Sequence, residues 1–296
     1  TRQNNTILKK MKIKKFNFND ANIEDFYIKN GFVVIRNSIE NRFLKKISRN
    51  ILSQIQKIEK KSQKTKKRID YHDISNLIMN NFESSQDYDE LIFQNKTKFI
   101  MNRLIGNDLC VLNYTALWIN VPTNTNPVLN KNEHVDAWTG TSINTIFLKL
   151  LITDCDKFNG ITVFPGTHLH GLYPVKNRTI DYKTFGIKLE KGLNLVLKKG
   201  DILIWHPLLV HSTTGHSKKN KRVSFTLRYT STENEFSSQE RALGYKTISV
   251  SSNNIIRRYI GNDLLQPFRI YGGKASIDKR LAKLYNKKYF TSLKKK

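Results

Sequence analysis

The chain has 296 residues, of which 39% are hydrophobic and 10% aromatic. This apolar content excludes an intrinsically disordered chain, and a chain of this length can bury one sizeable core. No apolar run approaches the roughly 20 residues that a membrane-spanning helix needs, and we expect no secretory leader at the start. Lys and Arg number 51 against 24 Asp and Glu, a formal net charge of +27.

The excess of positive charge has two explanations. A basic chain attracts phosphates, nucleic acid or anionic lipid surfaces, but the chain is also rich in Lys, Ile and Asn, whose codons are AT-rich. The basic residues are scattered, with higher local density at 57–68 and 216–222. The two cysteines, Cys110 and Cys155, give neither a disulfide framework nor a zinc-binding spacing. We therefore expect a cytoplasmic protein in a reducing compartment.

Residues 12–107 are predicted to form an α-rich N-terminal part. A short helix over 21–30, which Asn19 or Asp20 can cap, is expected to end at Gly31. The next residues, FVVIRN, are rich in β-branched side chains and predict a strand.

A second helix is predicted from about Ile39, because apolar residues recur there at every fourth position. They are Phe43, Ile47, Ile51 and Ile55. The lysine-rich segment 59–67 is expected to be a solvated loop. Residues 77–106 are predicted to be helical up to the glycine that ends them.

From Asp108 onward, short β-branched and aromatic runs alternate with Gly, Pro, Asn and Asp. These runs lie at 109–121, 145–154, 160–168, 193–211 and 222–231. Many short strands at this spacing predict a sandwich or a closed barrel over about 108–231. Residues 232–296 follow as a basic C-terminal extension, with a helix expected near 277–290. No linker separates these parts, so we expect a single domain, 1–296.

The stretch HVDAWTGTS places His134 and Asp136 two residues apart. If the segment is a strand, alternation directs both side chains to one face. A non-haem iron site needs two imidazoles and one carboxylate on one side of the ion. The pair supplies two of these three ligands, and a second histidine must come from elsewhere in the chain. The simpler alternative is a turn with a half-exposed histidine.

Two later segments bear on which histidine could be the third ligand and on what else lines such a pocket. In GDILIWHPLLVH, His206 and His211 have opposite parity, so an unbroken strand cannot direct both inward. In RVSFTLRY, Arg222 and Arg228 share one polar face, which must be solvent-exposed or line a pocket. In a pocket, one of these guanidinium groups could bind a carboxylate through two hydrogen bonds.

Five segments, taken in chain order, resemble the phytanoyl-CoA dioxygenase family: NGFVVIRN, HVD, FPGTHLHG, KKGDILIWHPLLVH and RVSFTLRY. The resemblance runs from about Asp25 to Tyr229. It implies a mainly β fold, with a double-stranded β-helix (jelly-roll) core and flanking helices. It also implies an oxygenase that uses Fe(II), 2-oxoglutarate and O2, and that hydroxylates or otherwise oxidises its substrate with release of succinate and CO2.

The resemblance assigns roles to individual residues. His134, Asp136 and His211 match the iron ligands of the family. Arg222, helped by Ser224, matches the arginine that binds the distal carboxylate of 2-oxoglutarate. The HVD segment is also similar to oxygenases of carbohydrate and aminoglycoside gene clusters. The implied substrate is a small molecule such as a sugar or a phosphate-bearing metabolite.

Further residues are candidates for the pocket. Either Asn113 or Tyr114 should face the co-substrate, since the two have opposite parity. Lys149 is unusual in a buried strand, where it could meet a carboxylate or extend towards solvent. For the substrate, the candidates are Trp138, Thr141 and His168, although a tight loop or a tied-down turn would also explain them.

Two other functions remain open. An oxidative nucleic-acid demethylase of the AlkB type would use the same chemistry. The two arginines six positions apart and the positive charge are compatible with it, but no aromatic-rich basic lid for a flipped base is evident. The other alternative is a jelly-roll binding protein that has lost turnover. The sequence leaves the oligomeric state and the identity of the substrate undetermined.

Overall fold

The computed structural model describes residues 14–66, 69–122, 132–177, 179–213, 220–234 and 244–251. The helices and strands described all lie in one compact unit, Thr1–Ser249, while Val250–Lys296 forms a second unit. The helix expected near 277–290 lies outside the described residues. Among the described helices, none is long and apolar enough to cross a membrane.

The chain begins with a short strand, a helix and a second strand: β1 (Lys15–Phe16), α2 (Ile23–Asn30) and β2 (Phe32–Ile35). The helix begins at Ile23, later than predicted. Asn22 is in the N-cap position, and its side chain makes no capping hydrogen bond. Asp20 instead accepts the backbone N–H of Asn17 at 2.9 Å, so neither predicted cap is used. Gly31 ends the helix as expected, with a φ of +76° that favours glycine.

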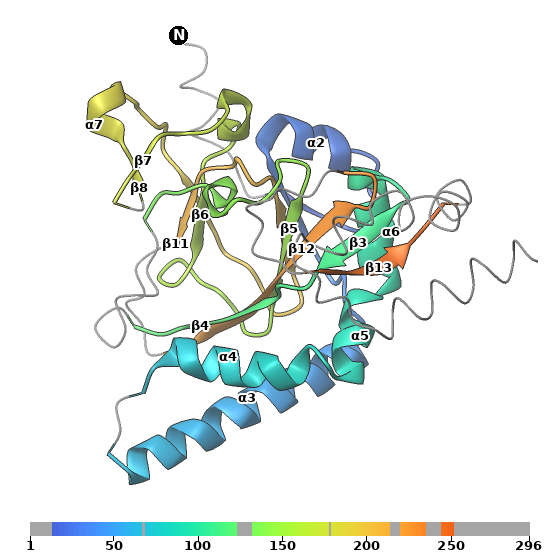
Figure 1. Cartoon of the computed structure of the whole chain (residues 1–296), viewed down its shortest axis with the longest axis vertical. Coiled ribbons are helices and arrows are strands. Elements are labelled where there is room, and N and C mark those ends of the chain that lie inside the picture. The colour runs from blue at the N-terminus through green and yellow to red at the C-terminus, as the bar shows by residue number, and fades with distance from the viewer. Residues whose placement is uncertain are drawn as a thin grey trace, which may run out of the picture. The chain divides into compact units, whose positions relative to one another are not determined.

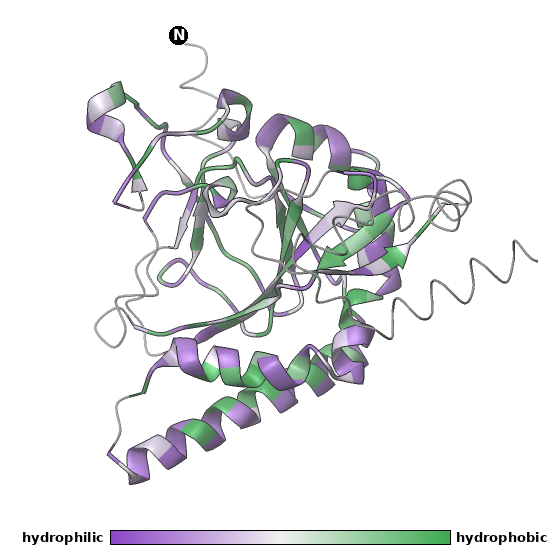
Figure 2. Cartoon of the chain, viewed as in Figure 1, coloured by the Kyte–Doolittle hydropathy of each residue, from purple (hydrophilic) through white to green (hydrophobic). Residues whose placement is uncertain are grey.

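Four further helices follow: α3 (Asn41–Lys64), α4 (Tyr71–Phe82), α5 (Gln86–Ile92) and α6 (Asn95–Ile105). The expected loop at 59–67 is wrong for most of its length, because α3 continues to Lys64. Glu59 keeps this last part in contact with the fold by accepting hydrogen bonds from Tyr71 and Lys221. The apolar faces of α3 and α4 meet, and their polar faces point outward (Figure 2).

Two sheets form the core (Figure 1). The larger one has the order β1-β2-β10-β5-β12-β3-β13, with β4 also paired to β12. Its further strands are β3 (Leu109–Leu112), β4 (Ala116–Asn120), β5 (Ile146–Leu151), β10 (Ile202–Trp205), β12 (Arg222–Ser231) and β13 (Tyr245–Ser249). The smaller sheet has the order β11-β6-β9, formed by His211–Thr213, Ile161–Val163 and Leu193–Leu195.

The remaining elements are short. They are the hairpin β7 (Val175–Lys176) and β8 (Thr179–Ile180), helix α7 (Tyr182–Phe185), and the 3-10 helices η2 (Asp136–Thr139) and η3 (Thr167–His170).

Side-chain alternation in the large sheet separates two hydrophobic layers. On β10, Ile202 and Ile204 pack with the helices, whereas Leu203 and Trp205 pack with residues of the smaller sheet. The large sheet therefore carries helices on one face and the small sheet on the other. This arrangement is the jelly-roll core with flanking helices that the sequence predicted.

The same alternation decides which way the polar stripe of β12 points. Val223, Phe225 and Leu227 belong to the helix-side core. Arg222 and Arg228, of the opposite parity, therefore project towards the smaller sheet, where they line a pocket.

Candidate active site

His134 and His211 face each other in an isolated antiparallel bridge. The backbone N–H of each donates to the carbonyl oxygen of the other, at 3.0 Å in both directions. Residues paired in this way project their side chains to the same face, and the two imidazole centroids are 4.3 Å apart. Because His211 opens β11, the bridge fixes His134 to the smaller sheet.

Main-chain carbonyl groups orient both imidazoles. Nδ1 of His134 lies 2.7 Å from the carbonyl oxygen of Asn132, and Nδ1 of His211 lies 3.0 Å from that of Leu209. A carbonyl oxygen can only accept a hydrogen bond, so Nδ1 carries the proton in each neutral ring. The lone pair is then on Nε2, which makes this atom the metal donor of each histidine.

Asp136 completes the group, but not by the strand alternation that the sequence suggested. It opens the 3-10 helix η2, which ends at Gly140 with a φ of +83°. The indole N–H of Trp205 donates to Oδ2 of Asp136 at 2.9 Å. The turn and this hydrogen bond, and not a strand, bring the carboxylate to the same point as His134.

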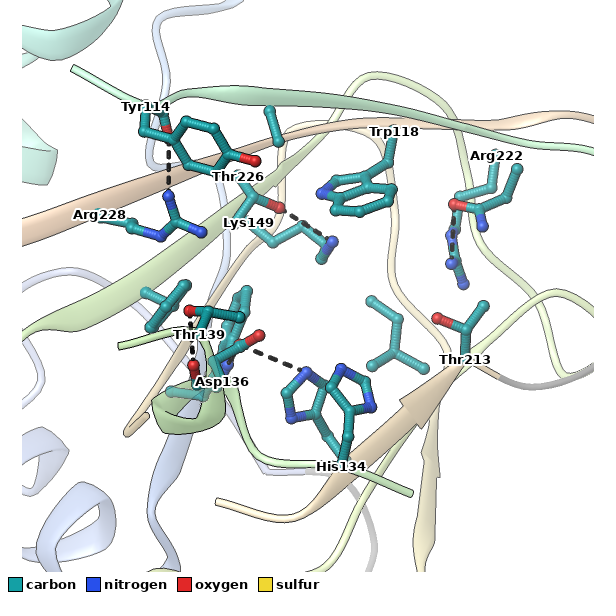
Figure 3. Close-up of a pocket in the computed structure, with 16 residues that line it drawn as sticks. Tyr114, Trp118, His134, Asp136, Thr139, Lys149, Thr213, Arg222, Thr226 and Arg228 are labelled. Atoms are coloured by element: carbon teal, nitrogen blue, oxygen red, sulfur yellow. Dashed lines mark hydrogen bonds and ion pairs between the residues drawn. The ribbon is translucent and has the colours of Figure 1, made fainter. Parts of the chain in front are cut away.

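One ligand atom from each of His134, Asp136 and His211 lies within 4.8 Å of the others. Nε2 of His211 is 3.5 Å from Oδ2 of Asp136. Two imidazole nitrogens and one carboxylate oxygen beside an open pocket form the donor set of the facial triad that binds non-haem Fe(II). The residues therefore fit iron. All three line the pocket, and Figure 3 shows His134 and Asp136 along one wall of it. No other group of three such ligands was found within the ranges described.

Arg222 lines the pocket although it is only 2% exposed. Its Nη1 donates to the carbonyl oxygens of Asn159 and Gly160, and its Nη2 donates to Oδ1 of Asn120 at 3.0 Å. Its Nε–H has no hydrogen-bond partner in the described part of the chain. Burial lowers the pKa of the Arg222 guanidinium, while the neighbouring Cys155 thiol opposes that shift. Neutral oxygens thus hold this cation, and one of its donors can still bind an anion.

Two hydroxyl groups are relevant to the Arg222 side of the pocket. Ser224, which the sequence proposed as a helper, is fully buried, and its Oγ has no partner among the residues described. It is not among the residues that line the pocket. Thr213 does line it, because it lies two positions after His211 on β11. The i+2 spacing from a proposed ligand was the signal that would have identified Thr213.

Lys149 lies in the middle of the pocket. It is paired with Thr226 across β5 and β12, and its Nζ donates to Oγ1 of Thr226 at 3.0 Å. The same ammonium lies 5.7 Å from the ring centroids of both Trp118 and Trp205. The lysine therefore faces the cavity between two indoles.

Tyr114, and not Asn113, lines the pocket. The backbone N–H of Asn113 donates to the carbonyl oxygen of Gly244 at 2.8 Å. The guanidinium carbon of Arg228 lies 4.2 Å from the ring centroid of Tyr114 and 5.2 Å from that of Phe147. Nη1 of Arg228 also donates to the carbonyl oxygen of Tyr114 at 3.4 Å.

The three substrate candidates from the sequence lie elsewhere. The indole N–H of Trp138 donates to a main-chain carbonyl at 2.8 Å. Thr141 is buried, and its hydroxyl lies 3.1 Å from that of Thr139. Nε2 of His168 is 2.9 Å from the carbonyl oxygen of Ile28 in α2. None of the three is among the described residues that line the pocket.

Strand β4 supplies a wall that the sequence interpretation did not include. Ala116, Trp118 and Asn120 line the pocket, whereas Leu117 and Ile119 are buried in the helix-side core. The sequence ALWIN contained this signal, since the aliphatic side chains of Leu117 and Ile119 alternate with non-aliphatic or small ones.

A comparison with family models matches residues 27–223 to the family described as Phytanoyl-CoA dioxygenase (PhyH). The matched region contains His134, Asp136, His211 and Arg222. A comparison with curated proteins gives no significant match.

Solved structures of similar fold are known. One is a non-heme monooxygenase, ThoJ, in its apo form (TM-score 0.58, 14% identity, 77% of this chain and 84% of that chain). A second is the non-heme alpha ketoglutarate dependent epimerase SnoN from nogalamycin biosynthesis (TM-score 0.54, 13% identity, 74% of this chain and 86% of that chain). A third is EctD from S. alaskensis with bound Fe (TM-score 0.54, 14% identity, 74% of this chain and 79% of that chain). At these identities the likeness concerns the fold.

Proposed function

The chain belongs to the phytanoyl-CoA dioxygenase family of Fe(II)- and 2-oxoglutarate-dependent oxygenases, and we propose that it oxidises a small molecule with release of succinate and CO2. Hydroxylation is the simplest form of this reaction, and a sugar or a phosphate-bearing metabolite is the proposed substrate class. The convergence of His134, Asp136 and His211 beside a pocket that Arg222 also lines carries the proposal.

His134, Asp136 and His211 would hold the iron through two Nε2 atoms and one carboxylate oxygen. When bound, Fe(II) supplies the activation of O2, which is coupled to the oxidative decarboxylation of 2-oxoglutarate. The carbonyl groups that accept the Nδ1 protons fix the planes of both rings. Trp205 fixes the carboxylate. Because these contacts orient the ligand atoms before the ion binds, less reorganisation opposes binding.

Arg222 is the proposed anchor for the distal carboxylate of 2-oxoglutarate. Its Nε–H is available, and a charge-assisted hydrogen bond is strong in so buried a place. Thr213 can add a hydroxyl donor on the same side of the pocket (Figure 3). Lys149 adds positive charge that favours a dianionic co-substrate. Trp118 and Trp205 wall this region and limit the access of water.

The nucleic-acid demethylase remains a second candidate because of the net charge of +27 and the two arginines six positions apart, Arg222 and Arg228. It would share the triad and both arginines, so turnover of 2-oxoglutarate does not separate the two functions. Salt dependence of DNA binding does, since each neutralised phosphate adds roughly −0.9 to the slope of log K against log salt for duplex DNA. A weak or absent dependence supports the small-molecule substrate.

The test begins with the purified full chain, because the substrate is unidentified. Anaerobic titration with Fe(II), followed by calorimetric titration with 2-oxoglutarate, should give one binding event for each. Succinate is then measured in the presence of O2, ascorbate and pooled sugars and phosphorylated metabolites. A chain that binds iron but not 2-oxoglutarate would contradict the proposed function. If it binds both and releases no succinate with any pool, the non-catalytic alternative is favoured.

A further inference from the structure

Strand β12 carries a second buried arginine on its pocket face, at the other end from Arg222. All ten residues of Arg222–Ser231 are buried, and Arg228 is 8% exposed. Six residues along a strand correspond to roughly 20 Å between Cα atoms. Figure 3 shows the two guanidinium groups on opposite sides of the pocket, with Lys149 between them. The pocket therefore has two separate cationic ends.

2-Oxoglutarate is short compared with this face of the strand. Its carboxyl carbons are joined by four bonds of about 1.5 Å, so they are at most about 6 Å apart. In the proposed function, one end of this molecule is at the iron and the other is at Arg222. Arg228 lies two positions beyond Thr226, the β12 partner of Lys149. Figure 3 places its guanidinium on the other side of Lys149 from Arg222, so an anion bound there would be a second ligand.

The surroundings of Arg228 suit the edge-on binding of an oxyanion. Its guanidinium lies over the ring of Tyr114 and near that of Phe147. Aromatic rings cover the flat face of a guanidinium, while its N–H donors point outward in the plane. Donors in this fork geometry match a carboxylate or a phosphate. Tyr114 is 38% exposed, so this end of the pocket borders on solvent.

The formal charges around the pocket also favour a second anion. The charged residues that line its described part are Lys149, Arg222, Arg228 and Asp136, with a sum of +3 − 1 = +2. Fe(II) adds two positive charges and 2-oxoglutarate adds two negative ones, so the loaded pocket keeps +2. A positive field in a low-dielectric pocket attracts anionic ligands.

We infer that Arg228, backed by Tyr114, binds an anionic group of the primary substrate, a carboxylate or a phosphate, and so selects acidic small molecules for oxidation. This inference rests on the proposed function, because it takes the triad as the metal site and Arg222 as the anchor of 2-oxoglutarate.

The test uses inorganic phosphate and acetate as probes. The full chain is loaded anaerobically with Fe(II) and saturated with 2-oxoglutarate, and tryptophan fluorescence is followed, since Trp118 and Trp205 line the pocket. The variants are Arg228→Gln and Arg228→Lys, with exposed Lys188→Gln as a control that removes the same charge elsewhere. Wild type and the control should bind one probe saturably. Arg228→Gln should weaken that binding roughly tenfold or more, and Arg228→Lys should weaken it less.

The outcomes distinguish a phosphate-bearing from a carboxylate-bearing substrate. They also distinguish failure of the anion site at Arg228 from failure of the proposed function. Tighter binding of phosphate assigns a phosphate-bearing substrate, and tighter binding of acetate assigns a carboxylate. If wild type binds neither probe, or if Arg228→Gln binds as wild type does, the inference is wrong. Tyr114→Ala, at the exposed edge, replaces Arg228→Gln should that variant not fold, and it should weaken binding in the same direction. Failure of the proposed function appears earlier and separately, as absent binding of 2-oxoglutarate.

Discussion

Trp205 donates its indole N–H to Oδ2 of Asp136 at 2.9 Å, although 69 positions separate the two residues in the chain. The same ring stacks on Phe147 and lies 5.6 Å from the imidazole of His211. Trp205 therefore links the carboxylate and one histidine of the proposed metal site to the hydrophobic layer between the sheets.

Trp205→Phe should weaken metal binding while the fold is kept. The substitution removes the donor to Asp136 but retains an aromatic ring in the packed layer. Loss of an outer hydrogen bond to a metal ligand typically costs 10- to 100-fold in affinity or activity. Anaerobic Fe(II) titration measures the change, and the thermal midpoint reports on the fold. An unchanged iron affinity would mean that the hydrogen bond does not orient the carboxylate.

His134→Ala and Asp136→Ala should each abolish iron-dependent turnover and lower the iron content well below one per chain. Each removes one of three ligands, which should exceed the effect of losing an outer contact. His72→Ala is the matched control, because His72 lies exposed on α4, where its ring forms a hydrogen bond with Asn76. Metal analysis after reconstitution gives the readout. Full iron content in either ligand variant would refute the assignment.

Arg222→Ala should raise the 2-oxoglutarate concentration required for half-saturation by about tenfold or more, since charge-assisted hydrogen bonds contribute about 1.5–3 kcal/mol. Arg222→Lys should recover little of this loss, because an ammonium cannot reproduce the fork of donors. Arg222 also holds the carbonyl groups of Asn159 and Gly160, so the thermal midpoint must be measured alongside. Thr213→Val offers a milder variant. Wild-type affinity for 2-oxoglutarate in Arg222→Ala would show that another residue anchors it.

Stability should fall in mildly acidic solution because of His206. Burial, with a smaller contribution from the charge of His168, lowers the pKa of His206 to about 4. An unfolded histidine titrates near 6.5, so between these values the unfolded chain binds a proton that the folded chain does not. The free energy of unfolding is therefore full above about pH 6.5 and decreases as pH falls towards 4.

Urea unfolding of wild type and His206→Gln over this pH range tests that expectation. The free energy of unfolding of the variant should depend less steeply on pH. The two slopes should differ by the equivalent of at most about one bound proton. Equal slopes would mean that His206 does not titrate differently in the two states.

Gly31→Ala should destabilise the fold more than Gly186→Ala. Both glycines have positive φ, +76° and +60°, so alanine pays a left-handed backbone penalty of roughly 1–2 kcal/mol at either position. At Gly31, however, the added Cβ would lie 2.5 Å from Nδ1 of His168, whereas at Gly186 nothing lies within 4 Å. The hydrogen bond of His168 to Ile28 holds that ring in place. Unfolding midpoints in urea should rank wild type, Gly186→Ala and Gly31→Ala in falling order.

Patterns local in sequence gave the most reliable predictions. The parity of RVSFTLRY placed Arg222 and Arg228 on one face of β12, which lines the pocket, and Gly31 ended α2 as expected. The spacing of His134 and Asp136 predicted that the two side chains lie together, and they do, but through a short 3-10 turn and not through an alternating strand.

Contacts between distant segments could not be predicted. No role was predicted for Trp205, because nothing local indicates that the pairing of β10 with β5 brings its N–H to Asp136. The role of Glu59 in extending α3 depends on Tyr71 and Lys221 in two other segments. In both cases the partner is set by how the sheets and helices assemble, and one chain segment does not contain that information.

The main-chain bridge between His134 and His211 has a consequence for how such a protein can change over evolutionary time. The 74 residues between Asp136 and His211 could gain or lose loop segments without displacing the bridge. A slip of one position in the pairing would turn one imidazole to the opposite face and dismantle the centre in a single event. The permissible variation in this chain is therefore in loop length, and the alignment of these two short segments is what must be inherited intact.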